Sequence, residues 1–259
     1  MPDDSEMCVR AFQQMLDLWI APEVARRQER GECPKPLNLR AAQVIFFADG
    51  RPHQVRINDE VSAMAAVRLK PGVPNTKGDR IRASDIDEID CVQLGDDVDP
   101  DCGHITAVLI GEHWRLFFDC RYNKAWAARH ISAAKEFLDA AQHAKSNHQW
   151  RSFVDNAFSA AELAAKALVL SAPVPGTKAI STHRAVHTGF NRLSRYGNVE
   201  ARHRDAFNEL AALREKARYP EREEFTLGAV AAEKYLLGLR GLIAEAEAWF
   251  NNPSRPTRG

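Results

Sequence analysis

The second half of the chain repeats apolar residues at intervals of three and four, and this pattern constrains the fold more than any other feature. In the stretch that begins at Ala125, the residues Ala127, Ile131 and Ala134 recur at this spacing, which is typical of the apolar face of an α-helix. The sequence predicts five helices between residues 123 and 251. The other four stretches are "RSFVDNAFSAAELAAKALVLS", "HRAVHTGFNRLSRYG", "VEARHRDAFNELAALREKARYP" and "TLGAVAAEKYLLGLRGLIAEAEAWF".

Residues that begin or end helices separate these stretches. We expect Gly197 to end the third helix as its C-cap, Pro220 to stop the fourth and Thr226 to open the fifth as its N-cap. Because short connections favour antiparallel neighbours, residues 122–251 are predicted to form an all-α up-down helical bundle. Residues 252–259 are expected to be a flexible tail.

The first half of the chain has shorter apolar runs, separated by Pro, Gly and Asp. An early helix is indicated by apolar residues from Phe12 to Trp19 and is closed by Gly31. The segment from Lys70 to Pro100 is rich in turn residues and is predicted to be largely loop. Residues 1–121 are therefore predicted to form a small α+β domain of unknown function. Its expected strands, rich in β-branched and aromatic residues, are Val44–Phe47, His53–Ile57, Ile105–Ile110 and Trp114–Phe118.

The composition of the chain limits the partners and the cellular compartment that we expect. The 35 basic residues are balanced by 35 acidic residues, so the whole molecule has no basic excess that would indicate nucleic-acid binding. The five cysteines are widely spaced and form no C-x-x-C pair, which argues against a zinc ribbon or a disulfide framework. The N-terminus lacks the apolar segment of a signal peptide, and no stretch approaches the ~20 apolar residues of a membrane span. We expect a cytoplasmic protein without a membrane partner.

The common sequence motifs of catalytic and nucleotide sites are missing from the chain, including the glycine-rich phosphate loops, the G-x-S-x-G elbow and H-E-x-x-H. An acidic run contains Asp96, Asp97, Asp99 and Asp101, but it lacks the Gly and Glu spacing of a calcium loop. We interpret this run as a solvated loop. No metal ion and no cofactor are predicted.

The fourth predicted helix carries one arginine where an apolar residue is expected. On a helical wheel, Arg214 projects into the middle of the apolar stripe that includes Phe207 and Leu210. A guanidinium cannot lose its proton, so it needs a carboxylate or an anion there. Asp155 and Glu162 flank the inward face of the second helix, and Glu162 is the predicted partner. The pair would either fix the packing of the helices or belong to a functional site.

The predicted bundle resembles the HEPN domains, small helical bundles from prokaryotic defence and toxin–antitoxin systems and from some eukaryotic RNA-processing proteins. The matching features are "DNAFSAAELAAKALVL", the Thr182–His183 pair and "LREKARYP", in the family's order and spacing. The resemblance covers about residues 129–250. It implies a homodimer, and in many members a metal-independent ribonuclease. Those members use an arginine, followed after four to six residues by a histidine, at the dimer interface.

This chain departs from that motif because no histidine follows Arg214, and Tyr219 stands near the expected position. A tyrosine phenol holds its proton at neutral pH and is a poor proton shuttle. We therefore expect a non-catalytic module that binds RNA, a nucleotide or a protein partner, with anion contacts from Arg214, Arg218, Tyr219 and His183. Its setting would be prokaryotic phage defence, stress or toxin–antitoxin pairing.

Two alternatives stay open. One is an atypical metal-independent ribonuclease or toxin built on Arg214, Tyr219 and Glu162. The other is a structural dimerisation bundle that serves the N-terminal domain. A structural reading of the arginines is also open, in which Arg218 pairs with Glu215 or Glu221.

Overall fold

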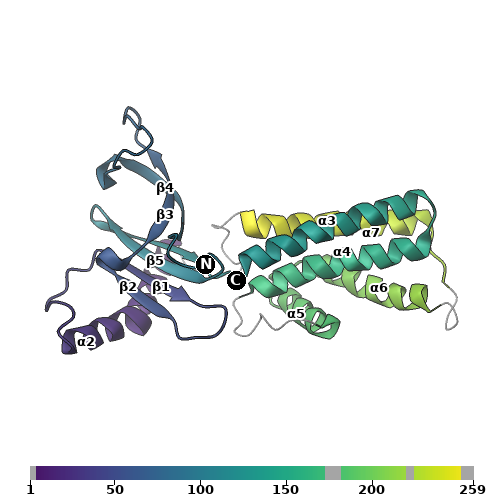
Figure 1. The fold of residues 1–259 in the computed structure, drawn as a ribbon, viewed down its shortest axis with the longest axis horizontal. Coiled ribbons are helices and arrows are strands. Elements are labelled where there is room, and N and C mark those ends of the chain that lie inside the picture. Colours follow the sequence, from purple (N-terminus) through teal and green to yellow (C-terminus); the bar gives the residue numbers. More distant parts are fainter. Residues whose placement is uncertain (1–3, 173–181, 220–224, 252–259) are drawn as a thin grey trace. The chain divides into compact units, whose positions relative to one another are not determined.

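The structure is a computed structural model that describes residues 4–172, 182–219 and 225–251. The chain divides into two compact units, Met1–Tyr122 and Asn123–Gly259 (Figure 1). Within the described ranges, no helix has the length and apolar character that a membrane crossing requires.

The first unit contains a four-stranded antiparallel sheet with the strand order β2-β1-β5-β6. The four expected strands are confirmed within it, because their β-branched and aromatic residues fit a half-buried pleated surface. Each strand pairs with its neighbours in an antiparallel register. The bounds are Ala41–Phe46 for β1, Gln54–Ile57 for β2, Gly103–Ile110 for β5 and His113–Asp119 for β6.

A second, two-stranded sheet corrects the predicted loop between residues 70 and 100. It pairs β3 (Ala63–Leu69) with β4 (Ile86–Leu94). The charged residues of β4, Asp87, Glu88 and Asp90, are exposed, and Arg68 forms a cross-strand ion pair with Glu88 at 2.8 Å. Acidic residues are depleted in strands, which is why the sequence of β4 does not resemble one.

The N-terminal helical segment packs on the four-stranded sheet. It runs through α1 (Asp4–Met15), a short π-helical turn (Leu16–Ile20) and α2 (Ala21–Glu29). Trp19 meets Phe46 edge-to-face, with ring centroids 5.4 Å apart. The early helix predicted from residues 12–19 is therefore confirmed, and its apolar residues form the core with β1, β2 and β5.

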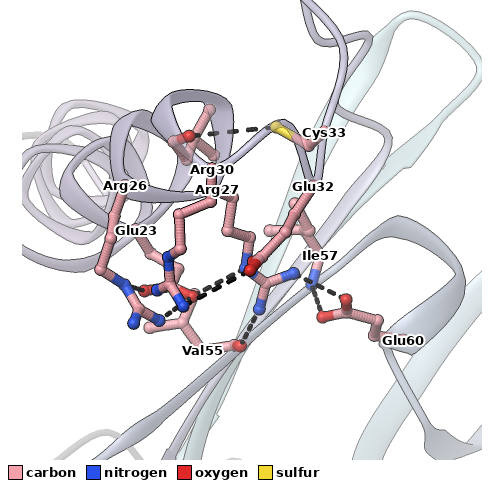
Figure 2. Close-up of polar contacts among 10 residues, drawn as sticks. Glu23, Arg26, Arg27, Arg30, Glu32, Cys33, Val55, Ile57 and Glu60 are labelled. Atoms are coloured by element: carbon pink, nitrogen blue, oxygen red, sulfur yellow. Dashed lines mark hydrogen bonds and ion pairs between the residues drawn. The ribbon is translucent and has the colours of Figure 1, made fainter.

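Arg27 fastens α2 to the edge strand β2, as Figure 2 shows. Its guanidinium donates to Glu23 on its own helix at 2.7 Å, to Glu60 at 2.6 Å and to the carbonyl oxygen of Val55 at 3.0 Å. Glu60 also accepts the backbone N–H of Ile57 at 3.2 Å. Because each of its three guanidinium nitrogens donates a hydrogen bond, Arg27 has a structural role.

The second unit is the predicted helical bundle. Figure 1 shows the long helices α3, α4, α6 and α7 lying along one another, and the shorter α5 packs against α4. All five predicted helices are present because each carries a continuous apolar face. Their bounds are Lys124–Ser146 for α3, Trp150–Ser171 for α4, His183–Arg195 for α5, Ala201–Arg218 for α6 and Ala229–Asn251 for α7.

The helix ends follow the sequence signals in part. Gly197 adopts a left-handed φ of +78° just after α5, and its N–H donates to the carbonyl of Ser194 at 3.1 Å, so its predicted role in ending the helix is confirmed. Thr226 does not open α7, which begins three residues later at Ala229. Pro220 and the tail at 252–259 lie outside the described residues.

Candidate functional site

The candidate site lies where α4, α5 and α6 meet. On α4, the residues Asp155, Phe158 and Glu162 are spaced by three and four, so they share one side of the helix. Phe158 is buried in the core and stacks on Phe207 of α6 at a centroid distance of 5.8 Å. The two carboxylates flank this aromatic pair along α4, one before and one after Phe158.

Two arginines from the last turns of α6 share one of these carboxylates. Arg218 binds Asp155 through two hydrogen bonds, Nε to Oδ1 at 2.8 Å and Nη2 to Oδ2 at 3.0 Å. Arg214, one turn earlier, donates from Nε to the same Oδ1 at 2.9 Å. The hydrogen bond from Arg218, followed by that from Arg214, lowers the pKa of the Asp155 carboxyl group against the opposing effect of its burial. One negative charge thus faces two positive charges.

Arg214 also lies over an aromatic ring. Its guanidinium carbon is 4.6 Å from the ring centroid of Phe158, which is within the range of a cation–π contact. The arginine that breaks the apolar stripe of α6 is therefore accommodated by a ring below it and a carboxylate beside it. The guanidinium of Arg214 is planar and can lie over an aromatic ring, which explains how a cation is tolerated so close to the core.

The predicted pairing of Arg214 with Glu162 is wrong, and the direction of the helices gives the reason. Arg151, in the first turn of α4, donates to the carbonyl oxygen of Ala217 at 2.6 Å. The start of α4 therefore lies beside the end of α6. This alignment brings Asp155 to the two arginines and places Glu162 two turns further along α4, away from them.

Glu162 instead contacts α5. Its Oε1 pairs with Nδ1 of His183, the first residue of that helix. The His183 side chain is 71% exposed, and its ring centroid is 6.4 Å from that of Phe158. The side chain of Thr182 caps the helix by accepting the N–H of Ala185 at 3.2 Å. The histidine is therefore held beside the same ring that Arg214 covers.

Tyr219 stands at the end of α6 as its C-cap residue, where its backbone N–H donates to the carbonyl of Glu215 at 3.2 Å. The residue is 43% exposed. The structure thus brings Arg214 and His183 to the ring of Phe158, pairs Glu162 with His183 and Arg218 with Asp155, and sets Tyr219 at the adjacent helix end. Asp155, which joins the arginines, was noticed in the sequence only as a residue flanking α4. Its position three residues before Phe158 does not distinguish it from Glu162, which lies four residues after the same ring.

The acidic run of the first unit does not converge on a cation site. Asp97 binds Arg56 at 2.7 Å, and the hydroxyl of Ser62, followed by Arg56, lowers the pKa of the Asp97 carboxyl group. Asp99 accepts the backbone N–H of Asp101 at 2.9 Å, which forms a local turn. The carboxylates of Asp97 and Asp99 therefore accept hydrogen bonds from within the first unit.

Comparison with known proteins identifies the second unit. The family model of the HEPN domain matches residues 127–248 and leaves the first unit unmatched. A comparison with curated proteins gave no match. The matched range contains α4, α5, α6 and most of α7, and so it contains the whole candidate site.

Proposed function

Because the second unit is a HEPN domain whose arginine has no histidine following it, we propose that this unit binds the phosphate groups of RNA without cutting the RNA. The observation that carries the proposal is the sharing of one carboxylate, Asp155, by Arg214 and Arg218. Two guanidiniums and one carboxylate leave one positive charge to be balanced. A phosphate oxygen is the acceptor that an arginine fork matches best.

The exposure of the two arginines divides their roles. Arg218 has 49% of its side chain exposed, whereas Arg214 has 20% exposed. Arg218 can exchange one carboxylate oxygen for a phosphate oxygen while Arg214 keeps the carboxylate in place. Tyr219 follows Arg218 directly and exposes a ring on which an unpaired base can stack. This set joins a phosphate contact to a stacking surface, which an RNA with unpaired bases can occupy.

The oligomeric state and the cellular role of the protein form a second part of the proposal. We propose that two copies associate through the helical unit, as expected from the family resemblance, and that the protein acts in a prokaryotic defence or stress response. Light scattering at micromolar concentration tests the first statement: a monomer there contradicts it.

A second function is favoured by the pair of His183 and Glu162. A carboxylate that holds a histidine fixes the ring and supports proton transfer. His183 and Arg214 contact the same ring, Phe158. In this alternative, α5 supplies the proton-transferring group that α6 lacks. His183 takes the proton of the 2′-hydroxyl, the 2′-oxygen attacks the adjacent phosphorus, and the bond from phosphorus to the 5′-oxygen of the next nucleotide breaks. The 5′-oxygen leaves as a hydroxyl with the proton returned by His183, a 2′,3′-cyclic phosphate remains, and Arg214 neutralises the charge on the phosphate. The enzyme would be an atypical metal-independent ribonuclease.

Binding is tested by the anisotropy of a fluorescently labelled single-stranded RNA over a range of salt concentrations. We expect wild-type affinity to fall with salt, and Arg218→Ala to weaken binding and reduce the slope of log affinity on log salt by about 1. The matched control is Arg202→Ala on the same helix, whose exposed side chain pairs with Glu200. Equal losses in both variants would contradict a specific role for Arg218.

Cleavage is tested in parallel with the same RNA in EDTA. If the unit only binds, wild type, His183→Ala and Arg214→Ala all leave the RNA intact. Cleavage that is lost in both variants establishes the ribonuclease alternative. Cleavage that persists in both variants points to a contaminating nuclease, and it leaves the binding result to decide the proposal.

A further inference from the structure

A second polar cluster lies away from the arginines, where the beginning of α6 packs against the middle of α7. Glu200, the N-cap residue of α6, and His203 are three residues apart, and Glu245 comes from α7. Each offers one ligand atom, and these atoms all lie within 4.8 Å of one another. Among the described residues, this is the one group of three or more such side chains close enough to hold a metal ion.

The histidine of this cluster is buried and incompletely bonded. His203 is 2% exposed, and its Nε2 lies 3.1 Å from Oε2 of Glu245. That oxygen accepts no hydrogen bond within the described part of the chain. Buried polar atoms without partners are costly and rare, and a bound ion is one of their established explanations.

The facing helix is shaped around the imidazole. Gly241 lies in the interior of α7, and a Cβ atom added to it would stand 3.0 Å from Cε1 of His203. Glycine within a helix costs about 1 kcal/mol relative to alanine, so its presence here indicates a close approach. Glu245 follows one turn later on the same side of α7, and its carboxylate therefore faces the ring.

We propose that Glu200, His203 and Glu245 bind a divalent first-row transition-metal ion, such as Zn²⁺ or Mn²⁺. Donors that each lie about 2.1 Å from one ion at roughly right angles are ~3 Å apart, and the 3.1 Å between Nε2 and Oε2 fits this spacing. Two carboxylates balance the charge of a divalent ion, and an imidazole ligand favours transition metals over Ca²⁺ and Mg²⁺. Helical bundles use the same Glu-x-x-His spacing to hold such ions.

Glu200 is the ligand that must change partner. It is exposed and now pairs with Arg202, Nε to Oε2 at 2.8 Å. Exposed ion pairs contribute little net free energy, so a divalent ion can take the carboxylate from the guanidinium. The ion then joins the first turn of α6 to α7. The proposal does not rest on RNA binding, because the arginine cluster lies at the other end of α6.

The test uses the full-length protein without a histidine tag, stripped of metal and titrated with Zn²⁺ and, separately, Mn²⁺ by calorimetry. We expect one ion per chain for at least one of the two metals. His203→Gln and Glu245→Gln should each weaken that binding by at least about tenfold, since removing even an outer partner of a ligand costs 10- to 100-fold. The control is Glu247→Gln, a partly exposed residue of α7 that pairs with Lys135, and this variant should bind as wild type does.

Binding of neither metal, or undiminished binding in both His203→Gln and Glu245→Gln, would overturn the proposal. If those two substitutions prevent folding, Glu200→Gln decides the matter, because an exposed side chain can be changed without affecting the core. Weaker metal binding by Glu200→Gln then supports the proposed site, and unchanged metal binding contradicts it.

Discussion

Arg218 binds Asp155 through both oxygens of the carboxylate, with nitrogen–oxygen distances of 2.8 and 3.0 Å. This parallel arrangement is the strongest form of an ion pair that an arginine makes. Arg214 adds a third hydrogen bond to the same group. Asp155 therefore orders both arginines and also competes with any anion that approaches them, and these two effects can be separated by experiment.

Replacing Asp155 by asparagine should tighten RNA binding. The amide keeps the size of the side chain but removes the negative charge that the phosphate must displace, so affinity at low salt should rise by about three- to tenfold. The anisotropy measurement described above provides the readout. Asp205→Asn is the matched control, since Asp205 pairs with Arg204 at the other end of α6. Weaker binding by Asp155→Asn would show that phosphates do not compete for these arginines.

We expect the fold to become less stable in acid, where the same carboxylate is protonated. Because the pKa of Asp155 is lowered on folding, mainly by Arg218, its contribution is present above its ordinary pKa and is lost as the pH falls through the lower, folded value. At pH 7, Asp155→Asn should reduce the free energy of unfolding by only about 1 kcal/mol, because solvent screens a group that is 39% exposed.

Urea unfolding, followed by the helical circular dichroism signal, checks this pH dependence. The difference between wild type and Asp155→Asn should be present at pH 6 and shrink well below pH 4. A difference that stays constant over this range would mean that the ion pairs do not stabilise the fold.

Another prediction concerns the close packing of α5 against α4 at Gly189. A Cβ atom at this position in α5 would lie 2.6 Å from Cγ1 of Val169 on α4. Gly189→Ala should therefore destabilise the bundle by about 1–3 kcal/mol, although alanine is the better helix former. Gly238 of α7 is the matched control, since its added Cβ would meet Ala206 at an ordinary 3.8 Å.

Thermal unfolding of both glycine variants gives the comparison. Gly238→Ala should be neutral or more stable by up to about 1 kcal/mol, whereas Gly189→Ala should unfold at a lower temperature. In a double-mutant cycle, Gly189→Ala should reduce the free energy of unfolding less in a Val169→Ala background than in the wild type, because the shorter side chain at position 169 leaves room for the added methyl group. A Gly189→Ala protein as stable as the Gly238→Ala protein would contradict the close approach of α4 and α5.

The fold was predictable wherever one side of an element is apolar. The five helices of the bundle and strands such as β1 carry continuous apolar patterns, and their sequences determine them locally. Strand β4 was missed because neither of its faces is consistently apolar. Its pairing with β3 depends on contacts across the sheet, such as that of Arg68 with Glu88, which cannot be predicted from local sequence.

The partners within the candidate site depend on how the helices pack, which the local sequence does not determine. The position of Arg214 in an apolar stripe predicted that it needs an anion, and the structure supplies one. The choice between Asp155 and Glu162 could not be made from the sequence, because it depends on how far α4 is displaced along α6. The cluster around His203 was missed for the same reason: Glu245 is far away in the sequence, and only the packing of α7 brings it close.

We expect the ionisation of Tyr235 to make the fold less stable in alkali. Its hydroxyl donates to Glu209 of α6 at 3.1 Å, and burial, together with this carboxylate, raises the pKa of Tyr235 from 10.0 to about 12. The folded chain keeps a proton that the unfolded chain loses in this range, so the free energy of unfolding should fall as the pH rises between these values. Absorbance of the phenolate should show one tyrosine that ionises near pH 12 in the wild type and is missing in Tyr235→Phe. Identical alkaline titrations of the two proteins would contradict the contact between α6 and α7.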